Sequence, residues 1–410
     1  MFHLHRIILV MFALVALSVE AQTPKPPATR QDSVREVIHG VEIVDPYRWL
    51  EDQDDPQTRK WIDAQDTYTH SLLDQLPARD TIRRRLTELS RVDRSLAPTE
   101  RNGRYFFSKR RAQDDLWIHY VRNGLAGSDQ VLIDPHTLSA DHTTDVDLED
   151  ISCDGTLLVY AVRQGGEDET ELRVMDVETR SNLPDRLPRA LYRGVSLKRD
   201  KSGFYYTLQS RDTGSRIRYH ALGTDPAQDV EVFGKGYGPD KWVGAEVSEN
   251  GRYLLLTVEH GWTRSEVYVQ DIAAGGPVTP IVNDLDAHFY GQFAGDVLVM
   301  QTDWQAPNSR LLTVDPKDPA RGNWKEIVPA GQDPIEEFSV AGGRLFVRYL
   351  HDVTSRIKIV APDGAVAGEV VLPGLGTATS PRGRWDSTEA FFDFVSYTTP
   401  RVIYRYDVAT

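Results

Sequence analysis

From residue 101 onward, apolar and polar residues alternate in short segments that come in pairs, and a tight turn precedes each pair. The same turn position is occupied by Gly103, Gly155, Gly203, Gly251, Gly295, Gly343 and Ser387, at spacings of 52, 48, 48, 44, 48 and 44 residues. A period in the forties with two clear strands per unit is typical of a β-propeller with about four strands per blade. We therefore predict a mainly β fold, a seven-bladed β-propeller preceded by a short helical N-terminal segment.

Each repeat contains one predicted hairpin. The paired segments are 104–108 with 116–121, 155–162 with 171–175, 204–208 with 216–220, 253–258 with 266–271, 297–301 with 310–315, 345–349 with 356–360, and 390–394 with 401–407. The first member of each pair is almost continuously apolar, as expected of a strand covered on both faces. The second member alternates, which indicates partial exposure. We assign the propeller to residues 98–410.

Residues 35–97 are predicted to form a helical segment. Asp55 before Pro56 is a helix-start signal, because aspartate caps free N–H groups and proline suits the first helical position. The helix that follows carries an apolar stripe at three- and four-residue spacing, formed by Trp61, Ala64, Tyr68, Leu72 and Leu73. A second helix, from about residue 80 to 90, carries Ile82, Leu86 and Leu89.

The first 34 residues predict export. Residues 1–21 hold Arg6, an apolar run over 7–17 and a small-residue cleavage pattern, so they are predicted to be a signal peptide. An uncleaved anchor is the alternative, although eleven apolar residues are short for a bilayer. Residues 22–34 are predicted to be a flexible leader. The mature chain is expected to be periplasmic or secreted and without a membrane segment.

Composition narrows the classes of function. The 410 residues are 40% hydrophobic and 26% charged, with a formal net charge of −14, which argues against a nucleic-acid partner. Cys153 is the single cysteine and is predicted to be a small buried residue at a strand end, not a catalytic thiol. The acidic pairs at 149–150 and 167–169 are interpreted as solvated loop charge. No His, Cys or carboxylate set has metal-ligand spacing, so neither a metal nor another cofactor is predicted.

The segment 45–52, Asp-Pro-Tyr-Arg-Trp-Leu-Glu-Asp, followed by Pro56, Thr58 and Trp61, closely resembles the N-terminal segment of the prolyl oligopeptidase family of serine peptidases. Residues 241–246 with 250–253 resemble a middle blade of that family, and 396–407 resemble its last blade. The resemblance implies a propeller that admits short proline-containing peptides to an α/β-hydrolase domain, which cleaves them after proline. The helical segment would pack on that domain.

The catalytic apparatus that the resemblance implies is missing from these residues. A serine hydroxyl needs a hydrogen-bonded imidazole and an orienting carboxylate, and in this family the serine sits on a Gly-x-Ser-x-Gly turn. The sequence contains no such motif, and His119, His220, His260 and His351 are interpreted as surface or blade residues. We predict no catalytic residue, a truncated and inactive chain, and a hydrolase domain supplied elsewhere. The alternative is a stand-alone secreted propeller that binds peptide or protein.

The resemblance also implies three residues that face the peptide from the propeller. Tyr192 would supply an aromatic contact, and Val243 and Trp262 would supply apolar contacts. Ordinary packing at blade ends is the alternative for each of them.

Overall fold

The computed structural model describes residues 24–409. The chain divides into two compact units, and the boundary in the sequence falls between Ser90 and Arg91. The predicted signal peptide lies outside the described residues. No helix among the described residues is long and apolar enough to cross a membrane.

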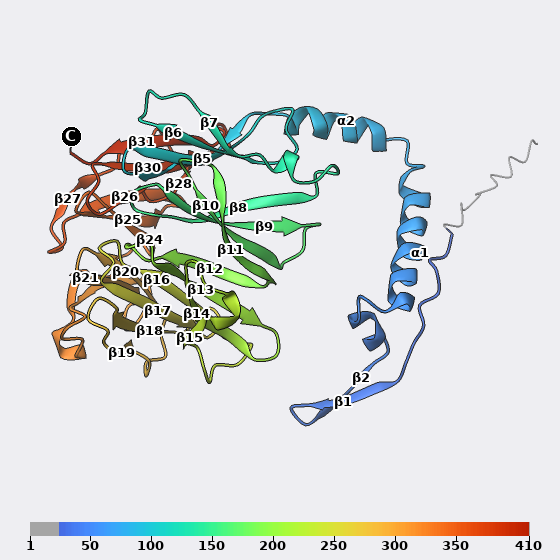
Figure 1. The fold of residues 1–410 in the computed structure, drawn as a ribbon, viewed down its shortest axis with the longest axis horizontal. Coiled ribbons are helices and arrows are strands. Elements are labelled where there is room, and N and C mark those ends of the chain that lie inside the picture. Colours follow the sequence, from blue (N-terminus) through green and yellow to red (C-terminus); the bar gives the residue numbers. More distant parts are fainter. Residues whose placement is uncertain (1–23, 410) are drawn as a thin grey trace, which may run out of the picture. The chain divides into compact units, whose positions relative to one another are not determined.

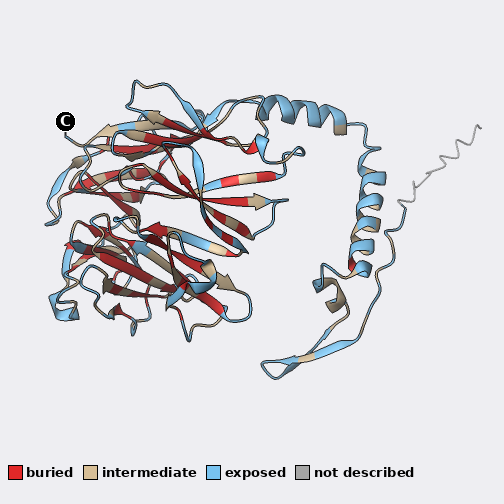
Figure 2. Ribbon diagram, viewed as in Figure 1, coloured by how far each residue is buried: buried red, intermediate tan, exposed pale blue. Residues whose placement is uncertain are grey.

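The first unit is mostly exposed (Figure 2). Its elements are β1 (Val34–Ile38), β2 (Val41–Asp45), the 3-10 helix η1 (Arg48–Glu51), α1 (Pro56–Leu73) and α2 (Arg79–Ser90). As predicted, Asp55 caps α1 by accepting from the backbone N–H of Gln57, and Pro56 is the first helical residue. The segment before β1 runs along α1, because Trp61 donates to Thr29 and Gln65 donates to the Pro27 carbonyl.

The β1–β2 hairpin is a feature that the sequence analysis missed. Its turn residues, His39 and Gly40, both have positive φ, at 52° and 80°. Two successive left-handed residues form the turn type that matches the natural twist of a hairpin. Apolar residues alternate with polar ones on both sides of His39–Gly40, and this pattern could have predicted the hairpin.

The second unit consists of seven sheets (Figure 1). In chain order their strands are β3 (Arg94–Ser95), β4 (Thr99–Arg101), β5 (Arg104–Arg110), β6 (Ile118–Asn123) and β7 (Gln130–Ile133); β8 (Thr144–Ile151), β9 (Leu157–Gln164), β10 (Thr170–Asp176) and β11 (Ser181–Ala190); β12 (Tyr192–Leu197), β13 (Gly203–Ser210), β14 (Gly214–Ala221) and β15 (Val230–Phe233); β16 (Trp242–Val247), β17 (Tyr253–Glu259), β18 (Ser265–Asp271) and β19 (Val278–Val282); β20 (Phe289–Ala294), β21 (Val297–Thr302), β22 (Arg310–Val314) and β23 (Lys325–Val328); β24 (Ile335–Ala341), β25 (Arg344–His351), β26 (Thr354–Val360) and β27 (Val366–Glu369); and β28 (Thr377–Ala378), β29 (Arg382–Gly383), β30 (Glu389–Val395) and β31 (Val402–Asp407). Short 3-10 helices, η2 (Pro135–Thr137), η3 (Pro226–Gln228) and η4 (Arg321–Asn323), lie in the connections. The prediction of a seven-bladed propeller is confirmed.

Every strand pair is antiparallel, and the strands of blades two to six follow one another in sequence order. The predicted glycine-led turns join the first strand of each blade to the second, so they lie at one end of the propeller, which we call the turn end. At Asn102–Gly103 both residues have positive φ, 53° and 78°, which glycine adopts without strain. The hairpins that join second and third strands lie at the other end, which we call the hairpin end.

Two blades depart from the predicted four consecutive strands. In the first, β3 and β4 both pair with β5, so the predicted boundary at residue 98 falls inside its sheet. In the seventh, β28 and β29 both pair with β30, and three strand positions are filled among the described residues. Pro381 lies between β28 and β29 and has no N–H to continue the ladder.

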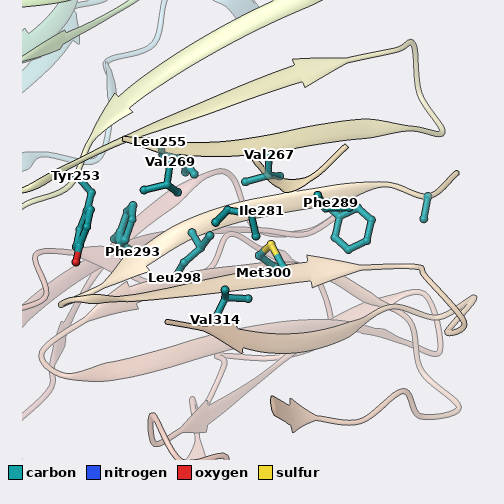
Figure 3. Close-up of a cluster of buried hydrophobic side chains, with 12 residues drawn as sticks. Tyr253, Leu255, Val267, Val269, Ile281, Phe289, Phe293, Leu298, Met300 and Val314 are labelled. Carbon is teal, nitrogen blue, oxygen red and sulfur yellow. The ribbon is translucent and has the colours of Figure 1, made fainter. Parts of the chain in front are cut away.

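The core is divided into seven clusters, one between each pair of neighbouring blades. Figure 3 shows the cluster between blades four and five, in which Phe289, Leu298 and Met300 are fully buried. The ring of Tyr253 stacks on Phe293 there, with centroids 5.1 Å apart. The seventh blade meets the first through a cluster of side chains, in which Tyr105 and Phe391 pack edge to face with ring centroids 6.0 Å apart.

Candidate functional site

The innermost strands of the propeller enclose a cavity of about 450 Å³, which we call the central cavity. Its wall comes from β4, β8, β12, β16, β20 and β29, one strand from each of six blades. Residues that are far apart in the sequence therefore face the same space, as Glu149 and Glu246 do. The cavity follows from the propeller fold, because only the innermost strand of each blade reaches the central axis.

The wall of the central cavity carries both acidic and basic side chains, and two of its carboxyl groups have strongly raised pKa values. Burial raises the pKa of Glu246 to about 7, and the negative charges of Asp150 and Glu249 add to the rise. Burial also raises the pKa of Glu149 to about 7. Glu246 keeps contact with water inside the cavity although the blades surround it. The cavity can therefore gain negative charge as the pH rises through neutrality.

Two of these carboxylates also hold blades together. Asp150 accepts from the backbone N–H of Leu197 at 2.8 Å, which joins the second blade to the third. Glu249 accepts from the backbone N–H of Trp385 at 3.1 and 2.8 Å, which joins the fourth blade to the seventh. Burial raises the pKa of each carboxyl, and these N–H donors oppose the rise.

The interpretation of residues 149–150 as solvated loop charge is wrong. Glu149 and Asp150 belong to β8, the innermost strand of its blade, and line the central cavity. Sequence spacing carries no signal for this, because the other charges of the cavity come from different blades. Among the described residues, no group of three or more His, Cys, Asp and Glu side chains is arranged to hold a metal ion.

A second cavity of about 640 Å³ lies at the turn end and is lined by residues such as Asn102, Asp154 and Asp386. Cys153, Arg199 and Arg384 line both this outer cavity and the central cavity, so they lie where the two meet. Cys153 is half-buried rather than enclosed in the core.

At the hairpin end, the fourth blade carries an exposed aromatic pair. Trp262, in the β17–β18 hairpin, is 89% exposed, and Trp242, at the start of β16, is 60% exposed. Their rings lie edge to face with centroids 6.4 Å apart. Tyr192 begins the neighbouring innermost strand β12, where its hydroxyl donates to the Pro188 carbonyl and its ring packs on Tyr206.

Val243 does not reach this surface. It is 4% exposed and packs in the cluster between the third and fourth blades. Successive side chains of a strand point to opposite faces, and here the alternation leaves Trp242 in the open position. The structure thus brings Tyr192 and Trp262 to the same end of adjacent blades, whereas Val243 is buried and its neighbour Trp242 is exposed there.

His220 and His119 are the two fully enclosed histidines of the described residues, and neither activates an accessible hydroxyl. His220 is fully buried between Asp185 and Asp229, at 3.1 and 2.8 Å, with no serine bonded to it. His119 lies 2.9 Å from the Ser108 hydroxyl, but both side chains are buried in the first blade. Burial lowers the pKa of His119, which favours the neutral ring. A substrate carbonyl cannot reach either group.

Comparison with known proteins agrees with this architecture. The family model described as "Prolyl oligopeptidase, N-terminal beta-propeller domain" matches residues 26–410. A prolyl endopeptidase from Elizabethkingia meningoseptica is 28% identical over 410 residues, which cover 97% of this chain and 58% of the relative. Dipeptidyl aminopeptidase BI from Pseudoxanthomonas mexicana is 23% identical and is covered over 59% of its length.

Solved structures give the same result. A structure from a study of two prolyl endopeptidases superposes with a TM-score of 0.88 at 33% identity, over 94% of this chain and 58% of that one. Prolyl oligopeptidase B from Galerina marginata, bound to a 35-residue substrate, superposes with a TM-score of 0.82 at 22% identity, which shows the fold alone. The chain therefore spans a little over half the length of the relatives that it matches.

Proposed function

The chain belongs to the prolyl oligopeptidase family, and from this premise we propose that it is the peptide-admitting propeller of an exported serine endopeptidase that cleaves short peptides after proline. Chemistry would come from a hydrolase domain outside these residues. In such a domain an imidazole takes the proton of a serine hydroxyl while backbone donors stabilise the oxyanion. The 410 residues supply no Gly-x-Ser-x-Gly motif for that step.

The observation that carries the proposal is the central cavity. A volume of about 450 Å³ lies in the range of small-ligand pockets, roughly 300–1,000 Å³. The blades surround it, so an extended peptide can enter along the axis while a folded protein cannot. A propeller of this kind acts as a size filter for its hydrolase domain.

The aromatic pair of Trp242 and Trp262 supports a contact with the peptide at the hairpin end. Both indoles are exposed and apolar. Proline presents a flat apolar ring and no N–H, so an aromatic surface suits it better than a hydrogen-bonding surface.

Peptide capture by the purified chain tests the proposal. A fluorescein-labelled octapeptide with an internal proline should raise its anisotropy on binding, whereas the same eight residues in a loop of a folded protein should not bind. Trp262→Ala should weaken capture about tenfold, the effect expected of a central aromatic contact. Tyr397→Ala is the matched control, because Tyr397 is a fully exposed aromatic in the β30–β31 hairpin of the seventh blade.

Equal binding of the free peptide and the folded display would contradict the size filter. Equal binding by the Trp262→Ala variant would remove the aromatic pair from the proposal. A second peptide, with its free N-terminus two residues before the proline-containing bond, serves as a comparison. Tighter binding of this peptide would indicate a preference for N-terminal dipeptides, as the name of the Pseudoxanthomonas relative suggests for that enzyme.

A further inference from the structure

The loop between β29 and β30, residues 384–388, crosses the turn end of the propeller, and we call it the strap. The backbone N–H of Trp385 donates to both carboxylate oxygens of Glu249, at 3.1 and 2.8 Å. Glu249 follows β16 in the fourth blade, on the other side of a seven-membered ring from the strap's own blade. This contact therefore spans the axis of the propeller.

Arg384 gives the strap a second anchor across the ring. Its Nη1 donates to the backbone carbonyl of Cys153 in the second blade at 3.0 Å. The same guanidinium is held in place by Asp386, which accepts from Nε at 2.9 Å and from Nη2 at 3.0 Å. The Arg384 side chain is only 13% exposed, so these acceptors meet a desolvated cation.

The strap also lies on the neighbouring blades. The carbonyls of Arg384 and Trp385 accept from the backbone N–H groups of Gly342 and Gly343, at 2.9 and 2.8 Å. The indole of Trp385 packs against the cluster between the fifth and sixth blades. A Cβ at Gly295 would come within 3.1 Å of the indole nitrogen, so the glycine allows the close approach.

These contacts place the strap where the central cavity meets the outer cavity. Arg384 lines both cavities, and so do Cys153 and Arg199 on the opposite wall. Arg199 donates to the backbone carbonyl of Glu249. The residue whose carboxylate accepts from Trp385 is therefore itself held in place. The turn-end opening of the central cavity is thus crossed by one loop that is fixed on three blades.

We propose that the strap closes the turn end of the central cavity and is latched by Glu249 and by the Cys153 carbonyl, so that ligands pass into the cavity from the hairpin end while the latch holds. The inference rests on contacts within the propeller and does not require peptidase activity. Two hydrogen-bonded anchors can open locally at far lower free energy than the blades unfold. The latch is therefore a closure that can be released without loss of the fold.

Cys153, the single cysteine of the sequence, reports on the latch without any added probe site. We would measure its labelling rate with a bulky maleimide and with iodoacetamide. The ratio of the two rates cancels changes in thiol reactivity and reports access alone. Glu249→Ala removes the acceptor of the Trp385 N–H and should raise the ratio about tenfold, as expected for the loss of a hydrogen bond to a charged group.

Glu246→Ala is the matched control, since Glu246 lines the same cavity and its carboxylate is neither hydrogen-bonded nor ion-paired to the strap in the described structure. Its ratio should stay at the wild-type value. Equal ratios for wild type, Glu249→Ala and Glu246→Ala would overturn the proposal. A rise in both variants would assign the effect to cavity charge and would overturn it as well.

If the Glu249→Ala variant does not fold, hydrogen exchange of the unmodified chain tests whether the strap is latched. The amide of Trp385 should exchange at least tenfold more slowly than the amides of the exposed β30–β31 hairpin, which lies at the other end of the same blade. Arg384→Gln should then speed that exchange by removing the second anchor. Exchange of Trp385 as fast as the hairpin would show that the strap is not latched.

Discussion

The hydroxyl of Tyr105 donates a 2.5 Å hydrogen bond to Oε2 of Glu389 and so joins the first blade to the seventh. Glu389 is also held by Arg405, whose Nε lies 2.6 Å from Oε1. Burial and, after it, the hydrogen bond to the Glu389 carboxylate raise the pKa of Tyr105, which keeps its hydroxyl protonated as a donor. Because no strand is shared between these two blades, closure of the ring depends on such side-chain contacts.

We therefore expect Tyr105→Phe to lower the free energy of unfolding by about 1 kcal/mol, the usual value of one hydrogen bond. Urea unfolding followed by circular dichroism measures the change. Tyr404→Phe is the control, because Tyr404 stacks on Phe392 in the seventh blade at 5.3 Å and no blade-closing bond involves its hydroxyl. A larger loss in the control than in Tyr105→Phe would contradict the assignment.

Truncation of Phe391, whose ring packs on Tyr105, should lower the free energy of unfolding further than loss of the hydrogen bond does. Phe391 is buried against Tyr105, and Phe391→Ala leaves a cavity between the first and seventh blades. We expect a loss of about 3 kcal/mol. If the midpoint of urea unfolding is unchanged, the first and seventh blades are not joined through this cluster.

The turns and hairpins of the propeller were predictable because each blade is a local unit with its own signal. Gly103 and Gly155 mark turns whose geometry depends on neighbouring residues alone. Glu246 and Glu249 could not be assigned to a cavity, since six blades must close before their surroundings exist. The sequence also could not decide which of Trp242 and Val243 is exposed, because an error of one residue in the register inverts the two faces of a strand.

The raised pKa of Glu246 predicts a pH-dependent stability. The folded state holds the proton up to about pH 7, whereas the ordinary value is 4.5, so the native chain binds more protons between these limits. Stability should therefore fall as the pH rises from about 4.5 through 7. Glu246→Gln should match wild type at pH 4.5 and exceed it at pH 8 by ~1 kcal/mol, a value that allows for solvent screening.

Thermal unfolding at the two pH values measures this difference. Glu326→Gln is a suitable control, because Glu326 lies on β23 away from the cavity and pairs with Arg310 at 3.0 Å. A Glu246→Gln variant with the same pH dependence as wild type would show that the carboxyl is ionised throughout.

The purified chain should not hydrolyse a chromogenic peptide with an internal proline, and a serine-directed phosphonate should leave it unlabelled. The reason is chemical: without a base bonded to an accessible hydroxyl, serine is a weak nucleophile. Intact-mass measurement detects a single phosphonate adduct. Stoichiometric labelling would contradict the proposal and would direct attention to the serine that reacts.

An immunoblot of the source cells separates the proposed peptidase propeller from a stand-alone binding propeller. An antibody against the propeller should detect a polypeptide well above the 46.3 kDa of these residues if a hydrolase domain continues the chain. A band at or below this mass, with no hydrolase in the immunoprecipitate, would favour the stand-alone alternative.

The segment 22–92 should be removed by trypsin before the propeller is cut. Thr58 is the single buried residue between 24 and 90, so this unit has no hydrophobic core of its own among the described residues. In α2 the apolar residues Ile82, Leu86 and Leu89 are 55%, 58% and 55% exposed. Exposed apolar surface of this kind marks an interaction site, and until it is covered the helix gains little from folding.

Trypsin would find its first sites in α2, where Arg83 and its neighbours are exposed. Limited digestion followed by mass spectrometry should therefore yield a stable fragment that begins near Arg91, where the second unit begins. The seven clusters between blades should protect that fragment, because cleavage requires local unfolding of the chain around the cut site. Equal resistance of both units would show that the helical segment is covered by another part of the chain. That result would favour the stand-alone propeller over a propeller that awaits a hydrolase domain.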